Sequence, residues 1–129
     1  MTPTLVLDTS ALLTLLEDEP GADRVEEALR SPDTVIPWPV VLELYYISLR
    51  LHGEAEADAR LAMLKHLDVV IEWGMDEAAV LTAARLKTGH RLSLGDAMIA
   101  AFAIRAHGTL LHKDPDFERL ADRVPLETL

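Results

Sequence analysis

Four acidic residues border or interrupt apolar segments of the chain, where a folded protein rarely places charge without a reason. They are Asp8 after TLVL, Glu43 within VVLELYYI, Asp96 before AMIAAFAI and Asp114 after TLLHK. Carboxylates that meet at the edge of a core repel one another unless a cation lies between them. A hard divalent cation with oxygen ligands is the simplest such cation. The pattern therefore indicates metal-assisted chemistry on a phosphate ester.

Two of these acids have a structural explanation when each is taken alone. Asp8, Thr9 or Ser10 could cap the first helix, and a hydroxyl cap would leave Asp8 free for another role. Asp96 follows Ser93 at the spacing of a capping box, although aspartate reaches back less well than glutamate. Both positions are therefore compatible with a helix cap and with a metal ligand.

The other acidic positions lie within a helical segment and in a turn. The neighbours of Glu43 one helical turn away are apolar or aromatic, and an unpaired carboxylate on such a face is costly to bury. Glu43 therefore needs a metal, a water or a basic partner such as Arg50. Asp114 and Asp116 lie in DPDF, and aspartate is common in turns because it bonds its own backbone. We expect Asp114, nearer the strand end, to be the ligand and Asp116 to position a water or cap a helix.

The elements that would position these acids alternate between strand and helix. Short apolar segments predict strands at residues 4–7, 34–36, 69–71 and 109–112, and the tail 124–126 could add an edge strand. Helical periodicity bounded by Pro and Gly predicts helices at 10–17, 22–30, 37–51, 54–67, 76–87 and 93–107. This order predicts a three-layer α/β domain whose short, mainly parallel central sheet of four or five strands is flanked by helices. Ligands bind such sheets at the carboxyl ends of the strands, where Asp8 and Asp114 are expected.

The composition limits the classes of protein to which the chain can belong. Its 129 residues, half of them hydrophobic, suit one compact domain over residues 1–129. The absence of cysteine excludes disulfides and thiolate metal sites and fits a reducing compartment. The N-terminus lacks the basic region of a secretory signal, and Glu43 and Arg50 break the longest apolar run before it could span a bilayer. We therefore expect a cytoplasmic location.

The formal net charge of −10 argues against a broad basic face for nucleic acid, but it does not exclude a nuclease. A metal would neutralise part of this charge, and the acidity also suits a basic partner protein. The densest basic stretch contains Arg85, Lys87 and Arg91, upstream of Asp96. With Lys113 it could contact an RNA backbone, or it could be a helix C-terminus whose basic side chains favour the helix dipole.

Four motifs of the chain resemble, in order and spacing, those of the PIN domain family, specifically its VapC-type toxins. They are LDTSALL, VVLELYYI, LSLGDAMIAAFAI and LLHKDPDF, and together they cover nearly the whole chain. The resemblance places the four family acids at Asp8, Glu43, Asp96 and Asp114. It implies a Mg²⁺- or Mn²⁺-dependent endoribonuclease, usually a homodimer, that a cognate antitoxin protein holds inactive.

One departure from the family pattern lies beside the fourth acid. Members often carry Thr or Ser two residues before that aspartate, whereas this chain has His112. A hydroxyl there could orient a ligand or a water, and an imidazole would do so differently. Thr9 and Ser10 keep the hydroxyls that members often have beside the first aspartate.

The resulting hypothesis is hydrolysis of an RNA phosphodiester at a site that holds Mg²⁺ or Mn²⁺ through Asp8, Asp96 and Asp114. Such an ion lowers the pKa of a bound water, which then attacks phosphorus. Glu43 could bind the metal or position a water. Because Mg²⁺ keeps several waters, we expect one or two direct carboxylate ligands.

Other functions remain open from the sequence alone. A phosphate-signalling receiver would carry paired acids after the first strand, whereas only Asp8 follows it here. A PIN-like nuclease acting on DNA, or in RNA processing outside a toxin–antitoxin pair, would use the same metal chemistry. A non-catalytic PIN module that only binds a partner is disfavoured because all four acidic positions are filled.

Overall fold

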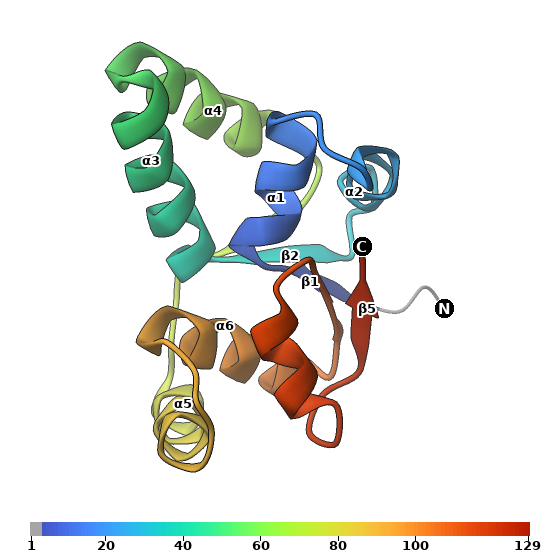
Figure 1. The fold of residues 1–129 in the computed structure, drawn as a ribbon, viewed down its shortest axis with the longest axis vertical. Helices are drawn as coiled ribbons and strands as arrows, with labels where there is room; N and C mark the ends of the chain where they lie inside the picture. The colour runs from blue at the N-terminus through green and yellow to red at the C-terminus, as the bar shows by residue number, and fades with distance from the viewer. Residues whose placement is uncertain (1–3) are drawn as a thin grey trace.

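Five short strands form one sheet in the computed structural model, which describes residues 4–129. The strands are β1 (Leu5–Leu7), β2 (Thr34–Pro37), β3 (Val70–Glu72), β4 (Thr109–His112) and β5 (Leu126–Thr128). Their order across the sheet is β3-β2-β1-β4-β5, and all four neighbouring pairs are parallel (Figure 1). The expected α/β architecture with a parallel central sheet is confirmed.

Helices cover both faces of this sheet. They are α1 (Thr9–Leu16), α2 (Ala22–Ala28), α3 (Trp38–His52), α4 (Glu54–His66), α5 (Glu77–Gly89) and α6 (Leu94–Arg105), followed by the 3₁₀ helix η1 (Pro115–Leu120). Figure 1 shows α1 to α4 on one side of the strands and α5 and α6 on the other. Within the described residues, no helix is both long enough and apolar enough to cross a membrane.

The inner strands are buried on both faces, as central strands of a parallel sheet must be. Val6 and Leu7 of β1 and Leu110 and Leu111 of β4 are fully buried. Helix α6 packs against β1 and β4 and is rich in buried alanine, which lets its backbone approach the sheet closely. Asp8 and Asp114 therefore follow two buried inner strands of the sheet.

The edge strand β5 begins later than the sequence predicts. The apolar segment 124–126 indicated a strand there, but Val124 still belongs to the turn after η1, and its N–H is bonded to Leu120 O. Pro125 has no N–H, and its carbonyl accepts the first bond from Leu110 of β4. Regular pairing therefore starts at Leu126.

Candidate metal centre

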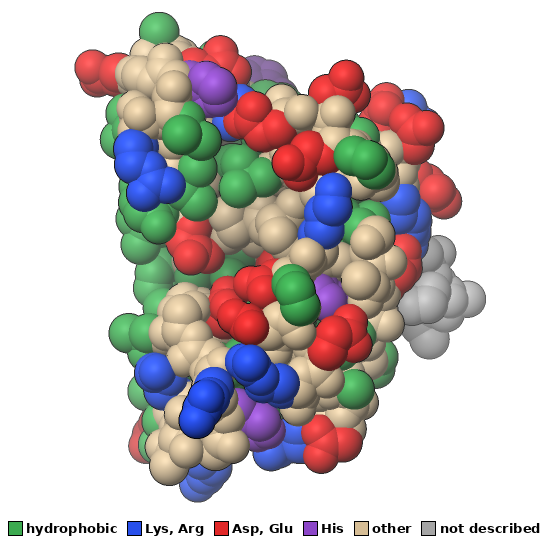
Figure 2. Space-filling model, in the orientation of Figure 1, with side chains coloured by type: hydrophobic (Ala, Val, Ile, Leu, Met, Phe, Trp, Pro, Cys, Tyr) green, Lys and Arg blue, Asp and Glu red, His purple; other side chains and the backbone are tan. Residues whose placement is uncertain are grey.

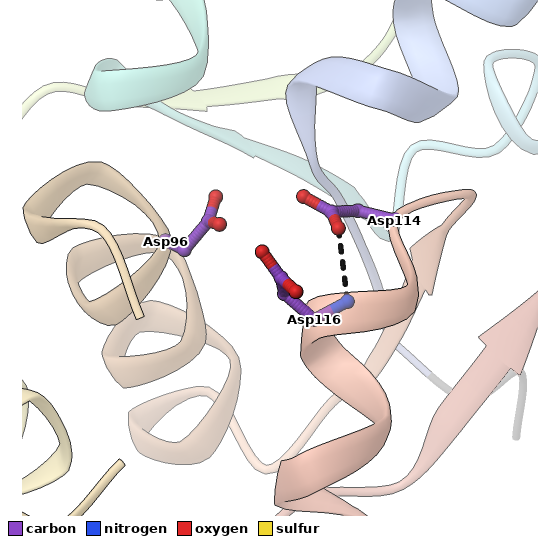
Figure 3. A group of neighbouring side chains, drawn as sticks. All are labelled: Asp96, Asp114 and Asp116. Carbon is purple, nitrogen blue, oxygen red and sulfur yellow. Dashed lines mark hydrogen bonds between the residues drawn. The ribbon is translucent and has the colours of Figure 1, made fainter. Parts of the chain in front are cut away.

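Three aspartates from two separate elements bring their carboxylates together at the carboxyl edge of the sheet. Asp96 lies in the first turn of α6, Asp114 follows β4, and Asp116 lies in η1. One oxygen of each lies within 4.8 Å of the others. Figure 3 shows the Asp96 and Asp116 carboxylates facing each other beside Asp114. Asp116, which the sequence placed in a supporting role, thus belongs to the same group as Asp96 and Asp114.

The backbone holds each of these aspartates at the start of a helix. Ser93 Oγ accepts a hydrogen bond from Asp96 N at 3.1 Å, as the capping-box spacing predicts. Asp114 Oδ1 accepts from Asp116 N at 2.9 Å and so caps η1 (Figure 3). Capping uses one lone pair of Asp114 and leaves other carboxylate lone pairs available for a cation.

Asp8 lies at the end of β1 and is almost fully buried, at 3% exposed. Its Oδ1 accepts from Ala11 N at 2.8 Å, so Asp8 itself is the N-cap of α1. Of the three residues that could cap this helix, the structure uses Asp8, and neither Thr9 nor Ser10 is the cap. Ser10 instead donates its hydroxyl to the Asp8 carboxylate at 2.7 Å and accepts from Lys113 N at 2.9 Å. This relay ties the end of β1 to the end of β4.

Glu43 reaches the site from α3. Thr9 Oγ1 donates to Glu43 Oε1 at 2.7 Å, which fixes the carboxylate next to the start of α1. A β-carbon at Gly95 would lie 3.1 Å from Glu43 Oε2, so the glycine provides the space that Glu43 occupies beside α6. Arg50, considered as a partner for Glu43, instead lies over the ring of Tyr46, 5.9 Å from its centroid.

The electrostatics of the site show that these carboxylates act on one another. Burial raises the pKa of Asp8 to about 7 against the lowering effect of its hydrogen bonds, and the charge of Asp96 adds to the rise. Burial also raises the pKa of Asp96 to about 6, with further contributions from Asp114, Glu43 and Asp116. Each carboxylate thus destabilises the charged form of a neighbour, which a cation between them would reverse.

The donor set fits a hard divalent ion. The candidate ligands are all carboxylates, and Mg²⁺ and Mn²⁺ prefer carboxylate oxygen over nitrogen or sulfur. The three clustered aspartates are partly exposed, which leaves room for the waters that Mg²⁺ retains. The residues present can therefore hold such an ion.

His112, the departure beside the fourth acid, contacts side chains of η1 and β5. It is fully buried, and its ring meets the edge of Phe117 at a centroid distance of 5.4 Å. Its Nε2 lies 3.5 Å from Thr128 Oγ1 on β5. Burial lowers the pKa of His112 below its ordinary value and favours the neutral ring. The imidazole thus packs η1 and β5 against β4.

The basic residues expected to contact RNA divide into two pairs. Lys113 Nζ donates to Pro20 O at 3.0 Å, and Lys87 Nζ donates to Leu92 O at 2.8 Å, so both amines hold backbone within the fold. Arg85 and Arg91 are exposed. Figure 2 shows acidic side chains gathered at the centre of one face with Lys and Arg side chains just below them.

Arg119 is a further basic residue at the site that sequence reasoning missed. Its Nη1 donates to Arg91 O at 2.6 Å and lies 3.3 Å from Asp116 Oδ1. The signal was present in DPDFER, where Asp116 and Arg119 have the i,i+3 spacing of neighbours on a helix.

The acidic cluster does not coincide with either of two sizeable cavities in the described part of the chain. A cavity of about 540 Å³ lies between the end of β3, α5 and α6, lined by residues that include Glu72, Phe102 and Arg105. A second, of about 480 Å³, is lined by Trp38, Trp73 and other apolar residues. The chemistry of the donor groups, and not cavity size, identifies the candidate site.

Comparisons with known proteins agree with this fold. The toxin–antitoxin complex from Klebsiella pneumoniae contains a chain with a TM-score of 0.73 and 21% identity, with 97% of each chain covered. VapBC2 from Rickettsia felis, bound to a promoter DNA fragment, gives a TM-score of 0.76 at 19% identity over 97% of this chain and 98% of that one. VapC20 from Mycobacterium tuberculosis, a sarcin–ricin loop cleaving toxin, gives 0.73 at 19% identity over 90% and 94%.

The TM-scores of these three structures show that the chain shares their fold. No curated protein matches the chain by sequence. The family model described as PIN domain matches residues 5–123, which is nearly the whole chain and includes all five acids of the site. The chain therefore belongs to the PIN domain family.

Proposed function

We propose that this protein is a metal-dependent endoribonuclease, the toxin of a VapBC-type toxin–antitoxin pair, and that residues 1–129 act as one nuclease domain. The observation that carries the proposal is the convergence of carboxylates from the ends of β1 and β4 and from α3, α6 and η1. Family membership supports nuclease chemistry with a divalent ion. The likeness to VapC20, a toxin that cleaves RNA, supports RNA as the substrate.

Asp96, Asp114 and Asp116 would hold Mg²⁺ or Mn²⁺, with Asp8 completing the donor set from β1. When bound, the ion lowers the pKa of a coordinated water and polarises the phosphate. Asp8, which Ser10 and the backbone hold in one orientation, has a pKa of about 7 without metal, and a bound cation would favour its charged form. In this proposal no residue of the protein forms a covalent intermediate with the substrate.

Glu43 and Thr9 act together in this proposal. The hydroxyl of Thr9 fixes one carboxylate oxygen of Glu43 and leaves the other directed past Gly95 at the start of α6. From there Glu43 can position the attacking water or bind the ion. The charge of Glu43 contributes to the raised pKa of Asp96, which supports a shared site for the two residues.

Arg85 and Arg91 are the basic residues best able to contact the RNA backbone, because their side chains are exposed. Neutralising both to Gln should weaken RNA binding and lower the slope of log affinity against log salt by about one per lost phosphate contact. Unchanged affinity and an unchanged slope in Arg85→Gln/Arg91→Gln would remove these residues from the interface.

An exposed apolar face on α3 supports a protein partner. Leu42 is 58% exposed and Tyr46 48%, and Trp73 adds a 59% exposed ring beyond β3. Figure 2 shows hydrophobic side chains along the same edge of the molecule. Extended apolar patches of this kind mark protein interfaces. We assign this face to the cognate antitoxin. A homodimer that buries the same residues would appear as a dimer of the isolated protein in light scattering.

The test is cleavage of total cellular RNA by the purified protein with Mg²⁺ or Mn²⁺. We expect discrete new RNA ends that disappear with EDTA and in Asp96→Asn. Asp68→Asn is the matched control. Asp68 is exposed and precedes the amino end of β3, whereas the acidic site lies at the carboxyl ends of the strands. Sequencing the ends would identify the target.

Two results would replace this proposal. Cleavage of DNA but not RNA would assign the site to a DNA nuclease. Absence of cleavage of either polymer, with binding of an antitoxin retained, would make the protein a partner-binding module.

A further inference from the structure

Arg119 joins the two elements that carry the clustered aspartates. A single nitrogen, Nη1, donates to Arg91 O at 2.6 Å and lies 3.3 Å from Asp116 Oδ1. Arg91 precedes Ser93, the N-cap of α6, so the Arg91 carbonyl lies on the segment that leads directly to Asp96. Arg119 therefore spans from η1, which carries Asp116, to the loop that positions Asp96.

A second basic side chain, that of Lys87, also holds this loop. Lys87 Nζ, from the last turn of α5, donates to Leu92 O at 2.8 Å. Two consecutive carbonyls, those of Arg91 and Leu92, are thus each bound by a basic side chain from a different element. A loop anchored in this way has little freedom to shift the first turn of α6.

We propose that Arg119 is a positioning residue of the metal centre, which sets the separation of Asp96 and Asp116 by fixing η1 to the α5–α6 loop. This inference rests on the proposed function, because it assumes that the aspartates bind a divalent ion. Arginine suits the task because its guanidinium stays charged at all accessible pH and offers several donors in a fixed plane.

Two other roles for Arg119 predict different results. As an ordinary surface ion pair, with Arg119 and Asp116 about half exposed, it would contribute little to stability, and its removal would leave Mn²⁺ affinity unchanged. As a counter-ion that competes with the metal, its removal would strengthen cation binding, because a positive charge 3.3 Å from Asp116 would be lost. A positioning role predicts weaker binding.

The experiment measures Mn²⁺ affinity by titration calorimetry on the wild type, Arg119→Ala, Arg119→Lys and the control Arg123→Ala. Arg123 is exposed and lies just beyond η1, and its removal changes the net charge equally. We expect affinity about 10-fold to 100-fold weaker in Arg119→Ala, by analogy with residues that orient metal ligands. Arg119→Lys should be intermediate, and Arg123→Ala should match the wild type.

RNA cleavage provides the second readout. The Mn²⁺ concentration for half-maximal activity should rise in Arg119→Ala by the same factor as the dissociation constant, while the rate at saturating Mn²⁺ stays within about threefold of the wild type. Mn²⁺ affinity that is unchanged or tighter in Arg119→Ala would overturn the inference. A wild type that binds no Mn²⁺ would instead contradict the proposed function itself.

A loss of folding must be separated from a loss of positioning. Melting temperatures without metal would identify any variant that fails to fold. If Arg119→Ala does so, Lys87→Met offers an independent test, because it removes the other anchor of the loop and leaves Arg119 in place. The inference predicts weaker Mn²⁺ binding in Lys87→Met as well, and unchanged binding there would count against it.

Discussion

The two sides of the acidic site are built in opposite ways. On the β1 side, Asp8 is buried and accepts hydrogen bonds from Ser10 and Ala11, and Glu43 accepts one from Thr9. On the β4 side, the partly exposed carboxylates of Asp96, Asp114 and Asp116 crowd together. Neutral side-chain and backbone donors hold the β1 side, whereas the β4 side combines a backbone donor at Asp114 with the positive charge of Arg119 beside Asp116.

This difference shows two ways of raising the pKa of a carboxyl group. Burial dominates for Asp8, and several hydrogen bonds oppose it. For Asp96, burial is joined by three neighbouring carboxylates. A cation relieves repulsion between like charges directly, so the β4 side should respond to metal most strongly. The β1 side is already organised without it.

The largest effect should come from Asp96→Asn. We expect at least about 100-fold slower RNA cleavage, because loss of a ligand should exceed the effect of losing a residue that merely orients one. The metal-free variant should melt at a higher temperature than the wild type, since one of the crowded charges is gone. Single-turnover cleavage and calorimetry would measure both quantities. A less stable Asp96→Asn would show that the carboxylates do not repel one another in the fold.

The pH dependence of stability distinguishes the two sides next. A carboxyl whose pKa is higher in the folded state binds more protons there, so stability falls as pH rises. The metal-free protein should therefore lose stability between about pH 4 and pH 7, the range from the ordinary value of 3.8 to the raised values of Asp8 and Asp96. His112, whose pKa is lowered, acts in the opposite direction below its ordinary value of 6.5.

Urea unfolding at several pH values, with and without Mn²⁺, would test this dependence. Asp8→Asn should remove the loss of stability between pH 6 and 7 and about half of the loss between pH 4 and 6, where Asp96 also contributes. Mn²⁺ should flatten the whole range because metal displaces protons from its ligands. A wild type whose stability rises steadily from pH 5 to 7 without metal would contradict the raised pKa values.

Much of the architecture follows from local sequence. Apolar strands that alternate with helices, and breaks such as Pro20-Gly21, predicted the order of elements and the edge of the sheet at which Asp8 and Asp114 lie. The capping of α6 by Ser93 also followed from spacing. These features depend on a few neighbouring residues, which is why a single sequence reveals them.

The details of the site depend on contacts between distant segments. The space beside Gly95 matters only because α3 brings Glu43 there, 52 residues away in sequence. Arg119 and Arg91 meet at a separation of 28 residues. Ser10 Oγ meets Lys113 N at a separation of 103 residues. No local pattern could indicate these pairings.

Gly95→Ala should have the next largest effect, because it disturbs the contact between Glu43 on the β1 side and α6 on the β4 side. The new β-carbon would lie 3.1 Å from Glu43 Oε2 and displace that carboxylate. We expect roughly 10-fold slower cleavage with little change in melting temperature. Gly89→Ala is the matched control, because nothing lies within 4 Å of its would-be β-carbon. Equal activity in both variants would show that the position of Glu43 is unimportant.

Ser10→Ala tests the hydrogen-bond relay from Asp8 to the end of β4. It removes the hydroxyl that donates to Asp8 and leaves Lys113 N–H without that acceptor, which should cost about 1–3 kcal/mol of stability. Denaturant titration would measure the loss. Mn²⁺ affinity should change less than in Arg119→Ala, because Ser10 contacts none of the three clustered aspartates. A larger effect on metal binding would move the metal toward Asp8.

The smallest effect is expected far from both sides, at the ion pair of Arg24 with Glu127. Arg24 Nε lies 2.6 Å from Glu127 Oε2 and joins α2 to β5, but both side chains are about one-third exposed. Arg24→Ala should therefore cost at most about 1 kcal/mol and leave cleavage unchanged. Reduced activity in this variant would mean that the sheet edge influences the site.

The most direct test of the central claim is to titrate the wild type and Asp96→Asn with Mn²⁺. Calorimetry measures the heat of binding, and the melting temperature measures the change in stability. The account predicts that Mn²⁺ binds the wild type and raises its melting temperature with ligand concentration, as binding to the folded state requires. Asp96→Asn should show neither effect. A wild type that shows no heat of binding and no shift in melting temperature at millimolar Mn²⁺ would contradict a shared metal site.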